Sequence, residues 1–324
     1  MSIDQPLQVA VGVLQNSQGQ VLVTLRHKHQ HQGGLWEFPG GKIHVSETVA
    51  QALRREFQEE LNVEILGSSP LIKIRHDYAD LSVQLHVDRI ERYLGEPVGM
   101  EGQALRWVAP EDLTTLQFPA ANIPIITAVQ LPDYYAILDS ETCLLGLDSD
   151  KIGLDLVAEL LRVLQSFLEQ DIKLIQGRLK NLDALLIQNF MQQALPLCEQ
   201  SCAILLLNSA VPGAWDHPSC VHLTSSDLMR LKHRPDGVRW LAASCHDLVQ
   251  LEHAQTLGVD FVVLAPILPT LSHPDVPAIG WDAFSKLLDR VNIPVYALGG
   301  MQKNDLNQAK QAGAQGIAGI RLFL

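Results

Sequence analysis

The stretch that most constrains the fold is residues 41–63, GKIHVSETVAQALRREFQEELNV, because it must form a helix that carries carboxylates on its core-facing side. Thr48 and Gln51 make a capping box, which predicts a helix starting near Thr48. Its apolar residues recur at helical spacing: Val49, Ala52, Leu53, Phe57 and Leu61. The sequence therefore predicts an amphipathic helix that ends before Asn62.

Carboxylates interrupt the apolar side of this helix. At about 100° per residue, Glu56 and Glu60 fall inside the apolar arc and Glu59 lies on its edge. Two such charges, 5–6 Å apart and partly buried, repel by roughly 3 kcal/mol at an effective dielectric constant near 20. A positive group must lie there. Mg²⁺ prefers oxygen ligands and bridges carboxylates to phosphates, whereas Arg54 or Arg55 could neutralise the charges internally.

The residues around and within this helix match the Nudix box, a pattern of fixed glycine, glutamate and arginine positions. The matching residues are Gly41, Glu47, Arg55, Glu56, Phe57, Glu59, Glu60 and Val63. Asn62 stands where the pattern has glycine. Because Asn tolerates a left-handed backbone better than any residue except Gly, this departure should cost of order 1 kcal/mol.

Length and composition set the outer limits. At about 150 residues per domain, 324 residues predict two domains, which we place at residues 1–130 and 131–324. The net charge of −12 argues against nucleic-acid polymers as partners. The five cysteines lack zinc spacing and are expected to be reduced thiols. Without a basic amino-terminal region or an apolar run near 18 residues, we expect a soluble, cytoplasmic protein with no membrane partner.

The first half alternates strand-like runs with the acidic helix. Residues 7–14 and 21–25 are apolar and β-branched, and the turn-rich residues 16–19 between them suggest a hairpin. Further strand-like runs follow at residues 71–74, 81–90 and 107–108. These features predict an α+β fold in which the acidic helix lies against a mixed sheet. The run RHKHQHQ at residues 26–32 could bind a metal, but it is more typical of a solvated loop.

Beyond the box, residues 5–128 resemble the MutT subgroup of Nudix hydrolases through LQVAVGVL, LWEFPGGKI, GEPVGMEGQ, RWV and FPAANIPII. Members of that subgroup hydrolyse oxidised guanine nucleotides, 8-oxo-dGTP above all. The resemblance implies a bound Mg²⁺, with Mn²⁺ as the alternative. It implies as ligands Glu56, Glu59, Glu60, Glu101 and the backbone carbonyl of Gly41.

The same resemblance assigns roles in catalysis and substrate binding. Water attacks the inner phosphorus and leaves a nucleoside monophosphate and pyrophosphate, with Glu56 as base or water-positioning group and Glu59 also in the catalytic set. Glu47 would orient the loop and Arg55 would pair with box carboxylates. By this resemblance Asn122 would recognise the oxidised base through its amide, and Arg26 would lie near the phosphates. Independently of the resemblance, the aromatic pair Trp36 and Phe38 could wall the base pocket. Phe38 could instead belong to the core.

The second half has a different rhythm, in which short apolar runs alternate with helical segments. Eight such runs occur, at residues 134–138, 173–176, 203–208, 221–224, 240–244, 261–266, 295–300 and 316–321. This alternation predicts an α/β (β/α)₈ barrel. LIQGRLK, ILLLN, VHLTSSDL, AASCH, FVVLAPILPT and YALGG resemble thiamine monophosphate synthase and its TenI relatives over about residues 132–324. A phosphate-bearing ligand is expected near Gln176, Arg178, Lys180, Asn208, Asp227, His246, Thr270, Gly299 and Gly300.

The barrel departs from the synthase pattern at two places. Asn208 is followed by Ser209 where the pattern has Asp, and His273 replaces an expected lysine. A ligand-binding barrel is therefore favoured over a second full enzyme.

Three hypotheses follow for the whole chain. The favoured one is an 8-oxo-dGTP pyrophosphohydrolase that sanitises the nucleotide pool. The alternatives are a Nudix enzyme acting on a thiamine-related pyrophosphate, and a barrel that regulates the first domain or acts as a thiazole tautomerase or thiamine phosphate synthase.

Overall fold

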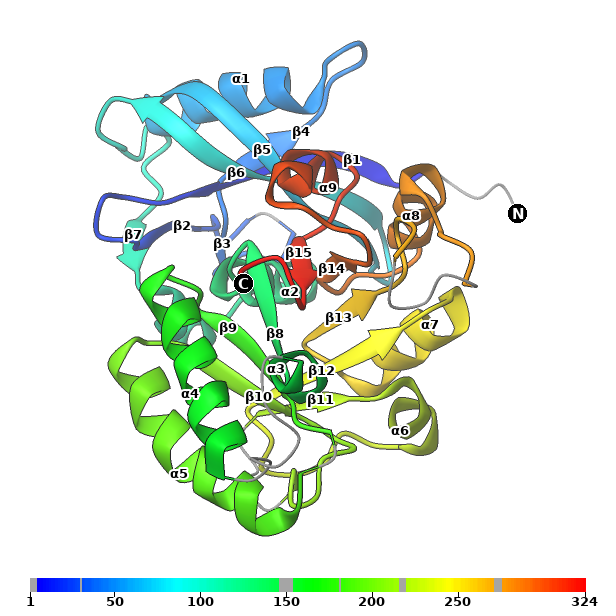
Figure 1. Cartoon of the computed structure of the whole chain (residues 1–324). Helices are drawn as coiled ribbons and strands as arrows, with labels where there is room; N and C mark the ends of the chain where they lie inside the picture. Colours follow the sequence, from blue (N-terminus) through cyan, green and yellow to red (C-terminus); the bar gives the residue numbers. More distant parts are fainter. Residues whose placement is uncertain (1–4, 30, 146–153, 181, 216–219, 271–275) are drawn as a thin grey trace. The chain divides into compact units, whose positions relative to one another are not determined.

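The computed structural model describes residues 5–29, 31–145, 154–180, 182–215, 220–270 and 276–324 (Figure 1). The chain divides into two compact units, residues 1–131 and residues 132–324. His273 lies outside the described residues. Among the described residues, no helix has the length and apolar composition needed to cross a membrane.

The first unit contains two sheets. The larger has the order β4-β1-β6-β5, formed by β1 (Leu7–Leu14), β4 (Gly40–Lys42), β5 (Glu64–Asp77) and β6 (Ser82–Leu94). Strand β1 is antiparallel to β4 and parallel to β6, so the predicted mixed sheet is confirmed. The smaller sheet has the order β3-β2-β7 and is antiparallel, with strands β2 (Val21–Leu25), β3 (Trp36–Glu37) and β7 (Leu105–Val108).

The predicted hairpin between the first two strands is wrong in its pairing. The chain does turn back, with Gly19 donating to the carbonyl of Asn16 and a single antiparallel bridge between Gln15 and Val21. The strands then separate into different sheets. Both edges of β1 are already paired, with β4 and β6, so no edge is left for β2.

Helix α1 (Val49–Leu61) carries the acidic residues, and its capping box of Thr48 and Gln51 is formed as predicted. Its apolar side packs on the sheet through Ala52, Leu53, Phe57 and Leu61. The helix ends at Asn62, whose φ of 54° confirms the left-handed conformation. Two 3₁₀ helices (Pro110–Thr115 and Ala120–Asn122) and α2 (Ile123–Gln130) complete the unit and pack on its second core.

The second unit is a closed parallel barrel, as predicted. Its strands follow one another in chain order: β8 (Tyr134–Asp139), β9 (Leu174–Arg178), β10 (Ile204–Asn208), β11 (Cys220–Leu223), β12 (Trp240–Cys245), β13 (Phe261–Leu264), β14 (Val295–Leu298) and β15 (Gly316–Gly319). Strand β15 pairs with β8 and closes the ring. The described helices are α3 (Ser140–Leu144), α4 (Leu154–Glu169), α5 (Ala184–Gln200), α6 (Ser225–Arg230), α7 (Leu248–Leu257), α8 (Trp281–Leu288) and α9 (Leu306–Gln311), with a 3₁₀ turn at Lys303–Asp305.

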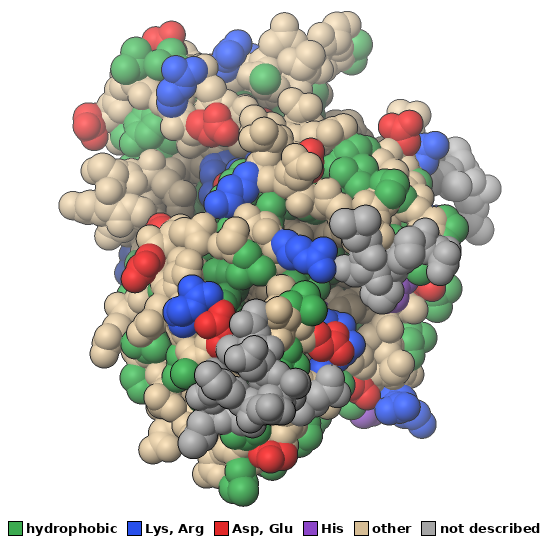
Figure 2. All heavy atoms as spheres, viewed as in Figure 1, with side chains coloured by type: hydrophobic (Ala, Val, Ile, Leu, Met, Phe, Trp, Pro, Cys, Tyr) green, Lys and Arg blue, Asp and Glu red, His purple; other side chains and the backbone are tan. Residues whose placement is uncertain are grey.

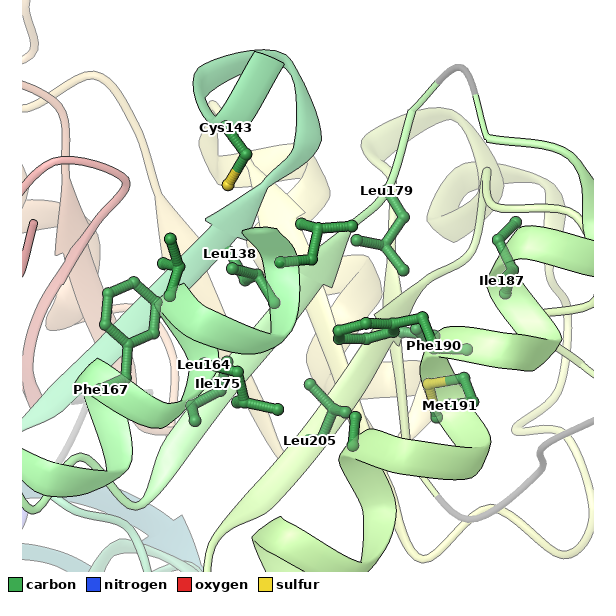
Figure 3. Packing of buried hydrophobic residues seen from close by; sticks show 14 of the residues in the cluster. Leu138, Cys143, Leu164, Phe167, Ile175, Leu179, Ile187, Phe190, Met191 and Leu205 are labelled. Atoms are coloured by element: carbon green, nitrogen blue, oxygen red, sulfur yellow. The ribbon is translucent and has the colours of Figure 1, made fainter. Parts of the chain in front are cut away.

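Helices α4 and α5 cover the strands where the barrel begins. Figure 3 shows this packing, in which Leu164 and Phe167 of α4 and Phe190 and Met191 of α5 meet strand residues Leu138, Ile175 and Leu205. Such close-packed apolar burial supplies most of the stability of a parallel barrel. On the face drawn in Figure 2, the Lys and Arg side chains are scattered among acidic and neutral ones and form no single basic patch among the described residues.

Candidate active site

Arg55 is the hub of the acidic helix. Its Nε and Nη2 donate to the two carboxylate oxygens of Glu47 at 2.8 and 2.9 Å, and its Nη1 donates to Glu56 Oε1 at 2.7 Å. A longer contact of 3.3 Å reaches Glu59, and Nη2 also donates to the carbonyl of Lys42. Internal neutralisation by Arg55 is therefore present, and it fixes the helix against the preceding loop.

Glu47 uses both oxygens in holding that loop. Besides the bidentate pair with Arg55, its Oε2 accepts a hydrogen bond from the backbone N–H of His44 at 2.9 Å. The hydrogen bonds from Arg55, followed by that from His44, lower the pKa of Glu47 to about 2. This carboxylate therefore remains ionised across the physiological range and acts as an anchor.

Glu56 lies directly against the backbone of Gly41. A Cβ added to this glycine would stand 2.2 Å from Glu56 Oε1, so any other residue would displace the carboxylate. The side chain of Glu56 is only 13% exposed. A carboxylate held against bare backbone suits a cation that takes one carboxylate and one carbonyl oxygen as ligands.

Glu60 is the most perturbed acid of the helix. Burial, and then the charges of Glu56, Glu101 and Glu37, raise its pKa to about 8. These four carboxylates therefore face one region. Because the negative charge of each carboxylate makes ionisation of the others less favourable, a bound divalent cation would stabilise all four in the ionised form.

The loop that carries Glu101 is tied to the end of α1. The carbonyl of Glu60 accepts hydrogen bonds from Met100 N and Gln103 Nε2, both at 2.9 Å, and Gln103 Oε1 accepts from Glu101 N at 3.0 Å. This places Glu101 beside the acidic helix although 41 residues separate it from Glu60 in sequence. Among the described residues, no three His, Cys, Asp or Glu side chains stand close enough to hold a metal as they are.

Glu37 is a member of this region that the sequence patterns did not identify. It lies on β3, and its side chain forms an ion pair with Arg26, at the end of the neighbouring strand β2. Burial raises the pKa of Glu37 to about 7 despite this arginine. The only sequence signal was its place between two aromatics, Trp36 and Phe38, which pack in the second core of the unit.

The expected base-binding residues lie around the start of α2. Asn122 is 9% exposed, and its side chain neither caps α2 nor makes a hydrogen bond to a described residue. Its amide is therefore available to a ligand. Phe38 is 2% exposed and stacks on Phe118 with ring centroids 5.5 Å apart, which places it in the core.

Tyr78 contacts the loop before α2, and His31 contacts Tyr78. The hydroxyl of Tyr78 accepts a hydrogen bond from Ala121 N at 3.4 Å. Of the histidines in residues 26–32, His31 lies edge-on to Tyr78 and 3.3 Å from Asp80. Within the described residues the histidine run forms no metal site.

The cations expected in the barrel are paired with acids. Arg178, at the end of β9, forms an ion pair with Asp139 and lies 3.6 Å from Glu141, which is also 3.7 Å from Lys180. Asp139 additionally caps α3 by accepting from Thr142 N. These pairs reduce the positive charge that could be offered to a pyrophosphate.

Asp227 is likewise used inside the fold. Its Oδ2 accepts from Ser209 Oγ at 2.6 Å and from Thr224 Oγ1 at 2.8 Å. The hydrogen bond from Ser209 lowers the pKa of Asp227 most, and the hydrogen bond from Thr224 and the nearby charge of Arg230 lower it further. The hydroxyl of Ser209 thus occupies the place of a second carboxylate.

The remaining barrel residues lie near the carboxyl ends of strands. Asn208 ends β10 and accepts from Ala210 N, and His246 follows β12 with Nδ1 2.9 Å from the carbonyl of Ala265. Thr270 follows β13. Gly299 and Gly300 follow β14 with positive φ, and a Cβ on either would stand within 2.8 Å of the loop after β13.

Gln176 belongs to a series of buried, hydrogen-bonded polar side chains inside the barrel. Gln176 hydrogen-bonds Tyr135, whose hydroxyl lies 2.9 Å from His222 Nδ1, and His222 Nε2 lies 2.9 Å from Ser244 Oγ. Burial lowers the pKa of His222 to about 3 and raises that of Tyr135 well above its usual value. The histidine is therefore neutral in the fold. No motif pointed to this series, because its members come from four separate strands.

Comparisons with known proteins divide at the same place as the structure. A family model described as NUDIX domain matches residues 10–128, and one described as thiamine monophosphate synthase matches residues 150–323. An 8-oxo-dGTP diphosphatase of Escherichia coli (strain K12) is 37% identical over 124 residues, which are 38% of this chain and 96% of that protein. A CTP pyrophosphohydrolase of the same strain is 30% identical over 122 residues, which are 38% of this chain and 90% of that protein.

The second half has its own relatives. A protein of Aquifex aeolicus (strain VF5), provisionally named thiamine-phosphate synthase 2, is 30% identical over 202 residues, which are 60% of this chain and all of that protein. A solved structure from work on MutT of Aliivibrio salmonicida and Vibrio cholerae is 33% identical, covers 39% of this chain and 97% of its own, and has a TM-score of 0.34.

Proposed function

Because the chain belongs to the Nudix hydrolases in its first unit and to the thiamine monophosphate synthase family in its second, we propose that its first unit is a Mg²⁺-dependent 8-oxo-dGTP pyrophosphohydrolase. The observation that carries the proposal is the group of four carboxylates formed by Glu60, Glu56, Glu101 and Glu37, of which Glu56 is pressed against Gly41. This arrangement fits a divalent cation, and the relatives that match this unit are named 8-oxo-dGTP diphosphatase and CTP pyrophosphohydrolase. The products are the nucleoside monophosphate and pyrophosphate.

The proposed cation ligands are Glu56, Glu59, Glu60, Glu101 and the carbonyl of Gly41. When bound, Mg²⁺ screens phosphate charge and makes a neighbouring water easier to deprotonate. Glu56 is the proposed base or water-positioning group, since its carboxylate is held in place by Arg55 and by the close approach of Gly41. Glu47 and Arg55 keep the loop and the helix in register for this chemistry.

Substrate choice rests on the loop before α2. The amide of Asn122 can both donate and accept, as recognition of an oxidised purine edge requires, and it has no partner among the described residues. A relative named CTP pyrophosphohydrolase matches this unit as well, so similarity over the Nudix region does not by itself identify the base. Oxidised guanine is therefore proposed on the strength of this loop.

The proposal is tested by steady-state hydrolysis of 8-oxo-dGTP, dGTP and CTP with Mg²⁺, with identification of the products. Glu56→Gln serves as the blank and Glu91→Gln, at an exposed position on β6, as the matched control. A preference of a hundredfold for 8-oxo-dGTP corresponds to about 2.7 kcal/mol of transition-state discrimination. Equal rates on the three nucleotides would refute the assignment of the oxidised base, and preference for CTP would replace it.

For the second unit we propose a phosphate-binding role without synthase activity. Ser209 stands where the synthase pattern has a carboxylate and donates a hydrogen bond to Asp227, so one of the two metal-binding acids is missing. Arg178 and Lys180 lie beside acids, which reduces the positive charge available to a pyrophosphate. The full chain should form no thiamine monophosphate from its two phosphorylated precursors, while inorganic phosphate should raise the unfolding temperature of the barrel. Measurable synthesis would overturn this proposal.

A further inference from the structure

Arg26 is expected near the substrate phosphates, but its ion pair with Glu37 has no role in the function described so far, and Glu37 belongs to the carboxylate group around Glu60. Glu37 lies on β3 opposite Thr24 of β2, and Arg26 directly follows β2; their side chains are only 24% and 22% exposed. A charged pair this deeply placed costs desolvation energy, which a purely structural contact could avoid with apolar residues. A role in the neighbouring carboxylate site would account for this desolvation cost.

Arg26 is held at several points, and one edge of its guanidinium is left over. Its backbone N–H donates to the carbonyl of Leu35, its Nε donates to the carbonyl of His31 at 3.0 Å, and its Nη1 donates to Glu37 Oε2. Its Nη2 makes no hydrogen bond to a described residue. An arginine fixed on one side with donors free on the other is preorganised for phosphate oxygens.

Glu37 links the guanidinium group of Arg26, called the fork below, to the acidic helix. It is close enough to Glu60 for its charge to help raise the pKa of that residue, while Arg26 offsets part of its own charge. A polyphosphate approaching this region meets several carboxylates. A fixed arginine at their edge would offer the compensating attraction without adding flexibility.

We infer that Glu37 is a positioning residue, which holds the guanidinium of Arg26 at the edge of the carboxylate group with its Nη2 side turned to the phosphates of a nucleoside triphosphate. The inference rests on the proposed function of the first unit. It assigns Glu37 no place among the cation ligands. Its effect is exerted through Arg26 and is independent of the base.

The test is a double-mutant cycle on the full chain, with Glu37→Gln, Arg26→Met and the double variant. The probe is dGTP in which a methylene replaces the oxygen between the α and β phosphorus atoms, and its Kd is measured by calorimetry at fixed Mg²⁺. Glu37→Gln should weaken binding about tenfold, because it releases the fork. In the Arg26→Met background the same change should have less than about a twofold effect, since the group it positions is gone.

Three further measurements make the cycle decisive. Glu91→Gln should leave the Kd unchanged, because Glu91 is exposed. The Mg²⁺ concentration at half-saturation should be the same in Glu37→Gln and wild type. Glu37→Asp keeps the charge and the fold but shortens the side chain by one methylene, so it should displace the fork and weaken binding about threefold or more.

Independent effects of the two substitutions on the Kd would overturn the inference. A large rise in the Mg²⁺ concentration that Glu37→Gln requires would also overturn it, because Glu37 would then be a cation ligand. Failure of the wild type to bind the analogue would overturn it as well. The steady-state preference for 8-oxo-dGTP is a separate readout. Loss of that preference with the coupling intact would refute the proposed substrate and leave the role of Glu37 standing.

Discussion

His222 makes the stability of the barrel depend on pH in a way that can be worked out from its surroundings. The imidazole is fully enclosed between Tyr135 and Ser244, and burial lowers its pKa from 6.5 to about 3. In the unfolded chain it has its ordinary pKa. Above pH 6.5 neither state binds the proton. Below pH 6.5 the unfolded state takes it up and the folded state does not, so the free energy of unfolding falls as pH falls, down to about pH 3.

The magnitude follows from the size of the shift. Each pH unit in this window is worth about 1.4 kcal/mol, so lowering the pH from 6.5 to 4 should remove roughly 3.4 kcal/mol. By pH 3 the loss should approach roughly 5 kcal/mol. That is a large part of the 5–15 kcal/mol by which domains are typically stable.

The assay compares wild type with His222→Gln by urea unfolding at pH 7 and pH 4. Glutamine can hydrogen-bond both Tyr135 and Ser244 but does not titrate. The carboxylates of the two proteins titrate alike, so their contribution cancels in the comparison. Wild type should lose roughly 3 kcal/mol more than the variant between the two pH values. Equal losses would show that the imidazole is not held neutral by burial, and the reasoning would fail.

Four shorter predictions follow from the same contacts. Asn62→Ala should lower stability by about 1 kcal/mol because alanine resists the left-handed backbone at φ 54°, whereas Asn62→Gly should change it by less than about 0.5 kcal/mol; urea unfolding measures both. Arg55→Lys loses the bidentate contact with Glu47 and should reduce kcat for pyrophosphate release at least about tenfold. Chelation by EDTA should abolish hydrolysis, and Mg²⁺ should both restore it and raise the unfolding temperature of the first unit, since it relieves repulsion among carboxylates. Ser209→Asp places a second carboxylate against Asp227 and should destabilise the barrel by about 1–3 kcal/mol, as measured by urea unfolding, with recovery on adding Mg²⁺.

Local patterns predicted much of the fold. The capping box at Thr48 and the left-handed turn at Asn62 depend on residues within a few positions of each other, so the sequence contained what was needed. The barrel could be predicted for a related reason. Its strands are short, mostly apolar and largely buried, and the alternation with helices leaves few other topologies.

Contacts between distant segments were not predictable in the same way. The pair of Arg26 and Glu37 and the buried series of polar side chains through His222 depend on which strands become neighbours. The hairpin failed for this reason too, since β6, far along the chain, takes the edge of β1 that β2 would need. The helix alone left Arg54 and Arg55 as candidates for neutralising the carboxylates, and the family resemblance predicted Arg55, which does pair with Glu47 and Glu56.

The way the barrel closes has a consequence for how the chain is made. Its first strand pairs with its last, Tyr134 opposite Ile317, so the ring cannot be completed until nearly the whole second unit has been synthesised. At 5–20 residues per second, ribosomes need roughly 10–40 s to produce a unit of this length. All the contacts within the first unit are available before that interval begins. The hydrolase part can therefore fold during synthesis of the barrel, whereas β8 and β14 each keep one unpaired edge until β15 has been made.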